Sequence, residues 1–421
     1  MIKKGLLYLK SNAQLRNFGV YGIGQFFNLV TPLIVAPYVI SVCGISGYGK
    51  ASLAMALMFF LMVFIDYGAD LTGVKNISVA RNDRKVLERV FTVAIASRAL
   101  MFALVSGVAA AIFISVPYFK SESELFLLSL TVLAGQMLNP TWFLQGVENF
   151  SQITFANVVS KFIYLSGVFV FITQPRDYIW LNVLWAAGMI LAYALSLWAI
   201  VKQYSFSFRQ VRLTDIRHYL SDGFSIFYSQ VFLSVQMYAP IVIVGMVGGD
   251  VMAGQYRVID QVIVVFKTYI LLFFNFVFSR VCYLLEHNPK HGLRYWFTAN
   301  GGNLVFLALS MAVIGVFARD VVAYFDPSHR DELAPVLLLA VWLPLLMGIS
   351  VPLKQLVVGA GREARYSQIT MMASVVSLAL VFWWVSKFGV SGSFLALITI
   401  EALTILLFLA FIKDKLLEWS K

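Results

Sequence analysis

The chain has 421 residues, of which 60% are apolar and 13% are charged, and its mean hydropathy is +0.82. Because charged residues make up about a quarter of an ordinary globular domain, this composition excludes a typical soluble fold. The formal net charge of +11 does not indicate a nucleic-acid partner, since excess Lys and Arg in membrane proteins mark cytoplasmic loops. We therefore expect an all-α integral membrane protein surrounded by membrane lipids.

Apolar runs long enough to cross about 30 Å of hydrocarbon recur along the whole chain. They predict about twelve transmembrane helices. The expected spans are 17–40, 49–71, 90–116, 125–146, 153–173 and 178–201 in the first half, and 222–247, 254–280, 295–317, 333–358, 366–386 and 392–412 in the second.

The charges of the loops between these spans predict the orientation. With the N-terminus inside, the cytoplasmic segments hold 21 Lys and Arg residues and the outer segments hold 6. Cytoplasmic loops carry such an excess in multi-pass proteins. Both termini are therefore expected in the cytoplasm, which requires an even number of spans.

A repeated junction indicates an internal duplication. Residues 139–160 read NPTWFLQGVENFSQITFANVVS, and residues 352–377 read PLKQLVVGAGREARYSQITMMASVVS. Both segments join two apolar runs, and both contain Ser-Gln-Ile-Thr followed by Val-Val-Ser. We interpret them as copies of one helix–helix junction.

The two halves also match at an offset of 205, which pairs Gln25 with Gln230, Gly44 with Gly249 and Gly49 with Gly254. Six spans per half make the repeats parallel, as in transporters that hold their cargo between two bundles. A duplicated membrane scaffold is the other interpretation of the repeat. The expected division is 1–201 for an N-terminal six-helix bundle, 202–220 for a cytoplasmic linker and 221–421 for a C-terminal six-helix bundle.

Motifs of soluble enzymes are absent from the sequence. The Gly-rich run 44–49 lacks the Lys-Ser/Thr pair of a nucleotide-binding loop, and Pro289 separates His287 from His291, which argues against a metal site on a helix. We therefore expect no catalytic residues, no metal and no cofactor.

Basic side chains inside the predicted spans are the main candidates for a cargo site. Ionisable groups are unfavourable in hydrocarbon and usually face a cavity or each other. A cationic cavity suits an anionic cargo, such as a pyrophosphate or an acidic sugar. The candidates are Arg98, Lys161, Arg257, Lys267 and Lys354. For Arg98 and Lys161, pairing with a carboxylate of Glu148, Asp66 or Asp70 is the alternative.

The eighth span places three ionisable residues on one stripe. At 100° per residue, Asp260 and Lys267 differ by about 20° in azimuth, and Arg257 lies about 60° from Asp260. A local pair of Arg257 with Asp260 would be purely structural, and by this interpretation it leaves Lys267 unpaired in the middle of the span.

Five acidic residues are candidates for ion coupling or gating, namely Glu401, Asp260, Asp66, Asp70 and Glu148. Glu401 lies near the middle of the last span without an opposite charge one turn away, so it is a candidate proton carrier or a structural carboxyl. Asp66 and Asp70 end the second span beside a basic loop, where they form either a gate or a structural salt-bridge cluster.

Two short motifs and the architecture resemble a known family. Phe64-Ile-Asp-Tyr-Gly68 with its basic loop, and Pro140-Thr-Trp-Phe-Leu-Gln-Gly-Val-Glu148, look like the ends of the second and fourth helices of the Wzx-type flippases. These form the polysaccharide transporter branch of the multidrug/oligosaccharidyl-lipid/polysaccharide exporter superfamily.

The resemblance implies a multi-pass flippase of the bacterial inner membrane. It would move an undecaprenyl-diphosphate-linked oligosaccharide, for O-antigen of lipopolysaccharide or a related surface polysaccharide, from the cytoplasmic to the periplasmic leaflet by alternating access. Other polysaccharide-assembly membrane proteins would be its partners.

Two other functions are distinguishable from the sequence. A cation-coupled multidrug exporter of the same superfamily would need an acidic cavity, whereas the residues inside the spans are mostly basic. A membrane glycosyltransferase or polymerase would need a large outer loop, whereas the longest one expected is 318–332.

Overall fold

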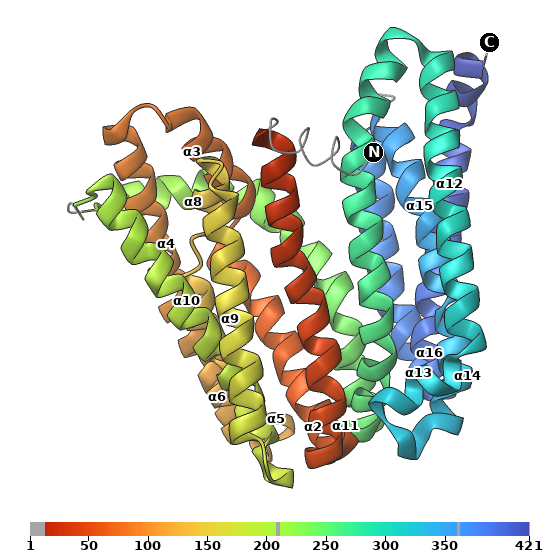
Figure 1. Cartoon of the computed structure of the whole chain (residues 1–421), viewed down its shortest axis with the longest axis horizontal. Helices are drawn as coiled ribbons and strands as arrows, with labels where there is room; N and C mark the ends of the chain where they lie inside the picture. Colours follow the sequence, from red (N-terminus) through yellow and green to blue (C-terminus); the bar gives the residue numbers. More distant parts are fainter. Residues whose placement is uncertain (1–12, 208–210, 360–362, 421) are drawn as a thin grey trace, which may run out of the picture. The chain divides into compact units, whose positions relative to one another are not determined.

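The computed structural model describes residues 13–207, 211–359 and 363–420, and every element in these ranges is helical (Figure 1). The chain divides into two compact units, Met1–Tyr238 and Ala239–Lys421. The boundary lies inside one long helix, beyond the linker expected at 202–220, so the expected bundle boundaries remain a prediction.

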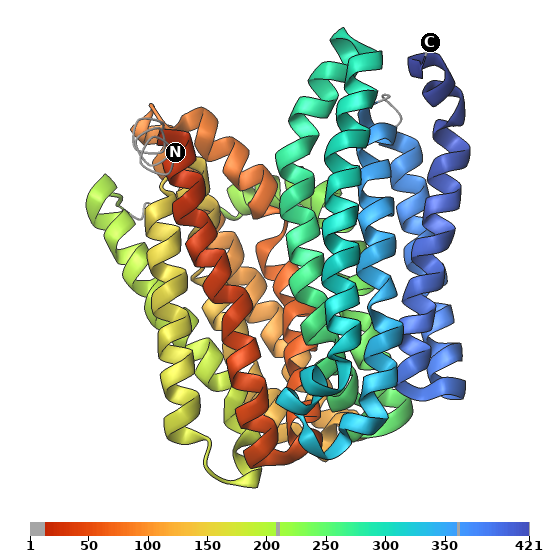
Figure 2. The same cartoon turned by 45° about the vertical axis from the view of Figure 1, so that its right-hand side comes forward.

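The first unit consists of long helices joined by short ones. α9 packs against both α2 and α10 (Figures 1 and 2). Its elements are α2 (Ala13–Asp66), η1 (Ala69–Gly73), α3 (Val74–Ala80), α4 (Arg84–Ser115), α5 (Pro117–Lys120), α6 (Ser123–Ser129), α7 (Thr131–Met137), α8 (Thr141–Gly146), α9 (Phe150–Phe171), η2 (Pro175–Trp180), α10 (Leu181–Tyr204) and the first part of α11 (Leu213–His287).

The second unit contains the rest of α11, and its α15 packs against α12 and α16. Its further elements are α12 (Pro289–Val316), α13 (Ala318–Phe325), η3 (Pro327–His329), α14 (Arg330–Ala340), α15 (Trp342–Gly359) and α16 (Glu363–Ser420). The turn of the second repeated junction falls at residues 360–362, outside the described residues.

Three long helices contain a glycine with non-helical geometry. Gly44 in α2 has φ 73° and ψ 166°, and Gly249 in α11 has φ 75° and ψ −171°. Gly389 in α16 has φ 58° and ψ −138°. Because positive φ with extended ψ is open essentially to glycine alone, each residue permits a sharp change of chain direction. Each also lies in a short segment between two of the predicted spans.

The expected span at 125–146 is not one continuous helix. α6, α7 and α8 occupy it, and the chain leaves the helix around Asn139 and Pro140. Proline has no N–H for the helical ladder and disfavours helical geometry at the preceding residue. The break therefore follows from Pro140, and it leaves carbonyl groups that need other donors.

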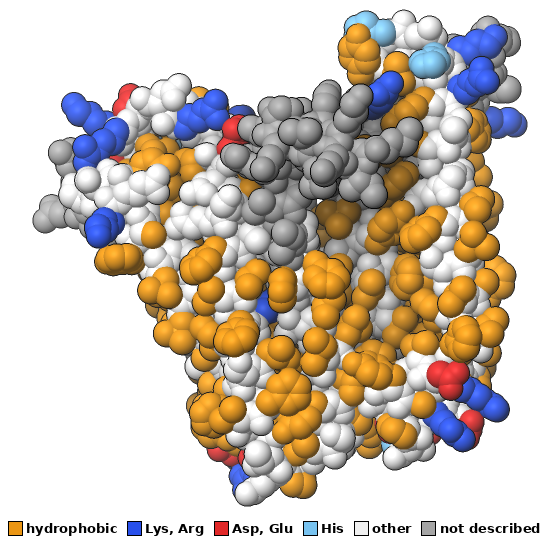
Figure 3. Space-filling model, in the orientation of Figure 1, with side chains coloured by type: hydrophobic (Ala, Val, Ile, Leu, Met, Phe, Trp, Pro, Cys, Tyr) orange, Lys and Arg blue, Asp and Glu red, His pale blue; other side chains and the backbone are white. Residues whose placement is uncertain are grey.

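Eight described helices are long and apolar enough to cross a membrane. Large hydrophobic side chains point outward from them, for example Val108 on α4 and Phe162 on α9, which are 61% and 69% exposed. On the face shown in Figure 3, hydrophobic side chains cover the middle of each unit, and Lys and Arg gather toward the helix ends. Such a surface suits a lipid environment, because the helices satisfy their own backbone hydrogen bonds and present apolar side chains to the hydrocarbon.

Candidate functional site

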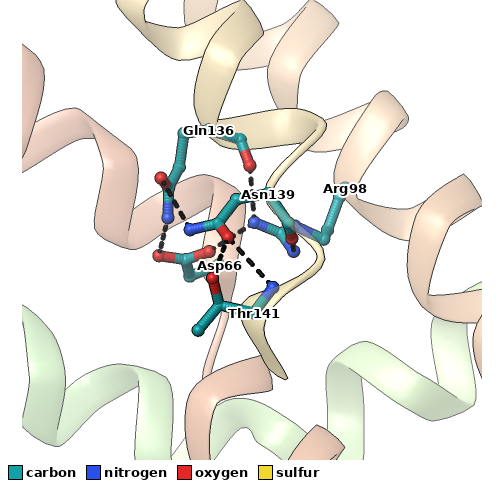
Figure 4. A network of polar contacts seen from close by, with 5 residues as sticks. All are labelled: Asp66, Arg98, Gln136, Asn139 and Thr141. Atoms are coloured by element: carbon teal, nitrogen blue, oxygen red, sulfur yellow. Dashed lines mark hydrogen bonds and ion pairs between the residues drawn. The ribbon is translucent and has the colours of Figure 1, made fainter. Parts of the chain in front are cut away.

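A buried ion pair joins α2 to α4 in the first unit. The guanidinium of Arg98 is 1% exposed, and its Nη2 lies 2.7 Å from Oδ1 of Asp66 at the end of α2. The same Nη2 donates to the carbonyl of Gln136 at 2.6 Å, and Nη1 donates to the carbonyl of Asn139 at 2.7 Å (Figure 4). Arg98 thus satisfies two carbonyls that the break at Pro140 releases from the helical ladder.

The neighbouring polar side chains complete this network. Gln136 Nε2 donates to Oδ2 of Asp66 at 2.6 Å, and the backbone N–H and hydroxyl of Thr141 donate to Oδ1 of Asn139 (Figure 4). Asp66 therefore binds two donors from two different helices. We call these five residues, Asp66, Arg98, Gln136, Asn139 and Thr141, the brace, because they hold the ends of α2 and α7 to the middle of α4.

The other two acidic candidates of the first unit lie at helix ends. Asp70 is exposed in η1. Glu148, with φ 59°, follows α8 in the repeated junction, and its carboxylate lies 3.2 Å from Arg81, with both side chains about half exposed or more. Ion pairs this exposed are worth little, about 0–1 kcal/mol, so Glu148 does not neutralise the buried cations of this unit.

Lys161 on α9 is buried without a carboxylate partner among the described residues. Its side chain is 7% exposed, and Nζ lies 3.2 Å from the ring centroid of Trp185 on α10. A cation over an indole face is stabilised by the ring quadrupole. The indole is in turn held edge-to-face by Tyr164 and Phe59, at centroid distances of 5.1 and 6.1 Å.

Close approach of two helices brings Lys161 onto Trp185. A Cβ built on Gly188 of α10 would lie 2.3 Å from the carbonyl oxygen of Ser160 on α9. Only a glycine allows this contact, which lies one residue before Lys161 and three residues after Trp185. Such small-residue contacts set the separation of helices in membranes.

In the second unit, the carboxylate of Asp260 forms ion pairs with two cationic side chains of α11. Arg257 Nη1 lies 3.0 Å from its Oδ2, and Lys267 Nζ lies 3.2 Å from its Oδ1. Three residues of one stripe therefore converge, as their azimuths predict. The interpretation that left Lys267 unpaired is wrong, because its extended side chain spans the seven residues to Asp260. Two cations thus share one buried carboxylate.

The last two candidates lie on α15 and α16. Oε2 of Glu401 accepts a hydrogen bond from the hydroxyl of Ser350 at 2.5 Å, which links these two helices. Lys354 lies one turn after Ser350 on α15 and is half-buried. The structure thus places Glu401 against a neutral donor.

Sequence reasoning missed Gln136, Trp185 and Ser350, which contact the predicted residues directly. The sequence does not show which charged residue the side chain of a Trp, Gln or Ser in an apolar helix will contact, because that contact depends on how the helices pack. Within the described ranges, no group of three or more His, Cys, Asp and Glu side chains is arranged to hold a metal ion.

The chain is similar to several known proteins. The profile of the family described as "Polysaccharide biosynthesis protein" matches residues 14–282. A "Putative O-antigen transporter" of Escherichia coli K12 is 21% identical over 407 residues, which cover 95% of this chain and 96% of that protein.

Two solved structures share the fold. The lipid II flippase MurJ in an inward closed conformation has a TM-score of 0.76 and 15% identity, over 95% of this chain and 89% of that one. An inward-facing multidrug resistance MATE family transporter of the MOP superfamily has a TM-score of 0.75 and 14% identity, over 94% of this chain and 95% of that one.

Proposed function

Because the chain belongs to the polysaccharide biosynthesis protein family, we propose that it is a flippase for lipid-linked oligosaccharides in the bacterial inner membrane. It transfers an undecaprenyl-diphosphate-linked repeat unit of O-antigen or a related surface polysaccharide from the cytoplasmic to the periplasmic leaflet. The full-length match to an O-antigen transporter supports a transporter and not an enzyme.

The observation that carries the cargo proposal is the isolated cation at Lys161. A buried ammonium without a carboxylate is unfavourable unless a ligand supplies the negative charge. Trp185 stabilises the ammonium but leaves it cationic. A diphosphate supplies the missing charge. Lys267, Arg257 and Lys354 form the corresponding positive set in the second unit.

Alternating access requires two bundles that rock about the cargo site. We infer twelve crossings in two parallel six-helix bundles, 1–201 and 221–421, with both termini cytoplasmic. The matched geometry of Gly44 and Gly249, which the sequence pairs at an offset of 205, supports this duplication. The eight long helices, three of which are divided in two by a kink, account for eleven crossings. The short helices α6–α8 together supply the twelfth.

A cation-coupled multidrug exporter is the second candidate, because the MATE transporter shares the fold. Its cationic cargo would meet the buried ammonium of Lys161, which has no carboxylate partner among the described residues. Like charges in a low-dielectric site repel strongly. The charge balance therefore favours the anionic cargo.

The experiment is a gene deletion in the native host, complemented with wild-type protein, Lys161→Ala or Lys202→Ala. Lys202 is a matched control because its ammonium also lies over an indole, that of Trp198 at 5.0 Å, but both side chains are exposed. We expect Lys161→Ala to lose most surface polysaccharide at an unchanged protein level, and Lys202→Ala to restore it.

The deletion strain itself tests the proposal. Accumulation of lipid-linked oligosaccharide in the inner leaflet, with loss of surface polysaccharide, is the expected phenotype. Undiminished surface polysaccharide together with new sensitivity to cationic drugs would overturn the flippase in favour of the exporter.

A further inference from the structure

One pocket of the first unit is lined neither by the five residues of the brace nor by Lys161. It has a volume of about 510 Å³ and lies between the start of α11, the turn after α2 and the α4 residue Leu100. This volume is within the range of roughly 300–1,000 Å³ that holds small molecules. The pocket has no part in the cargo site proposed above.

One wall of this pocket is built by a close contact between the α2 turn and α11. Tyr67 lines the pocket with φ 45°, which is uncommon for a bulky residue. Its ring stacks on Phe227 at a centroid distance of 4.3 Å and an interplanar angle of 8°. A Cβ on Gly223 would lie 3.0 Å from the Tyr67 carbonyl oxygen. Glycine at 223 therefore allows the turn after α2 to pack directly against α11, and this contact positions Tyr67 as one wall of the pocket.

The start of α11 combines an apolar stripe with a cation. Leu213, Ile216, Leu220 and Phe224 recur at helical spacing, and Leu213 and Phe224 are 78% and 56% exposed. Beside this stripe, Arg217 and Ser221 also line the pocket. Among the described residues Arg217 forms no ion pair. The pocket thus offers an apolar trough with one unpaired guanidinium at its edge.

We propose that this pocket binds an anionic phospholipid of the cytoplasmic leaflet. Its phosphate binds the guanidinium of Arg217 and the hydroxyl of Ser221, and an acyl chain lies along Leu100, Leu220 and Phe224. Basic pockets on the cytoplasmic side of membrane helices bind anionic headgroups in this way. One guanidinium and one hydroxyl suit a single phosphate, whereas an oligosaccharide would need many more polar partners.

Native mass spectrometry of the purified full-length protein tests the site. The probes are palmitoyl-oleoyl phosphatidylglycerol and phosphatidylcholine with the same chains. We expect selective retention of phosphatidylglycerol, and a roughly fivefold loss of that retention in Arg217→Gln, as for one basic side chain near an anionic headgroup. Arg212→Gln is the matched control, because it removes the same charge from an exposed side chain that does not line the pocket.

A second variant tests the trough without changing charge. Leu220→Trp fills the apolar trough of the pocket with a larger side chain. We expect this variant to retain less phosphatidylglycerol, while its elution volume in size-exclusion chromatography stays that of the wild type. Equal retention of both lipids, or equal losses in Arg217→Gln and Arg212→Gln, would overturn the proposal. So would retention of undecaprenyl phosphate through Arg217 without retention of phosphatidylglycerol. Because the assay involves no transport, these outcomes leave the flippase proposal unaffected.

Discussion

The brace allows the structural and the cargo-binding interpretation of Arg98 to be separated by one substitution. Arg98→Leu keeps an apolar side chain in the core of the first unit but leaves Asp66 without its cation. Breaking a buried pair in this way costs about 3–5 kcal/mol, because the remaining charge stays buried. The carbonyls of Gln136 and Asn139 also lose the donor that lies 2.6 and 2.7 Å away. We expect a large loss of stability.

Thermal unfolding in detergent, followed by size-exclusion chromatography, measures this loss. For a cooperative unit of about this size, each kcal/mol lowers the midpoint by about 2–4 °C, so Arg98→Leu should lower it by roughly 6–20 °C. Arg89→Leu is the matched control, since its pair with Asp215 spans 3.0 Å with the Arg89 side chain 74% exposed, and such pairs are worth about 0–1 kcal/mol. If both variants unfold within 2 °C of each other, the brace does not stabilise this unit, and a role of Arg98 in binding cargo becomes the better interpretation.

Three further predictions concern the second unit. Lys267→Ala in a complemented deletion strain should lower surface polysaccharide without lowering the protein level, because it removes one of the two cations beside Asp260 that are candidates for binding the cargo. Full polysaccharide output would contradict this role. Gly249→Ala should cost about 1–2 kcal/mol in thermal unfolding because φ is 75° there, whereas Gly301→Ala, in a helix with open space at its Cβ, should be neutral or stabilising. Glu401→Gln should abolish any stimulation of flipping by a proton gradient in reconstituted vesicles, and stimulation that persists would exclude Glu401 as the proton carrier.

Properties that lie within one helix could be predicted from the sequence. Hydropathy alone predicts the helical membrane class, because hydrocarbon requires long apolar helices that satisfy their own backbone groups. The cluster of Arg257, Asp260 and Lys267 could be expected from azimuth, since α-helical geometry fixes the direction of each side chain. The short segments between consecutive apolar runs likewise indicated where one span ends and the next begins, although the sequence did not show that Gly44, Gly249 and Gly389 make these bends.

Contacts between helices were decided only by tertiary packing. Arg98 had three carboxylates as possible partners in the sequence, and the break at Pro140 decided among them by releasing two carbonyls beside Asp66. Lys161 had the same three possible partners but binds none of them among the described residues. The close contact of Gly188 with Ser160 places the Lys161 side chain over Trp185 instead. The sequence by itself thus determined which charges enter the membrane, through composition and helical periodicity. The close approach of particular helices, which depends on side-chain volumes many residues apart, decided which of those charges pair with a carboxylate among the described residues and which do not.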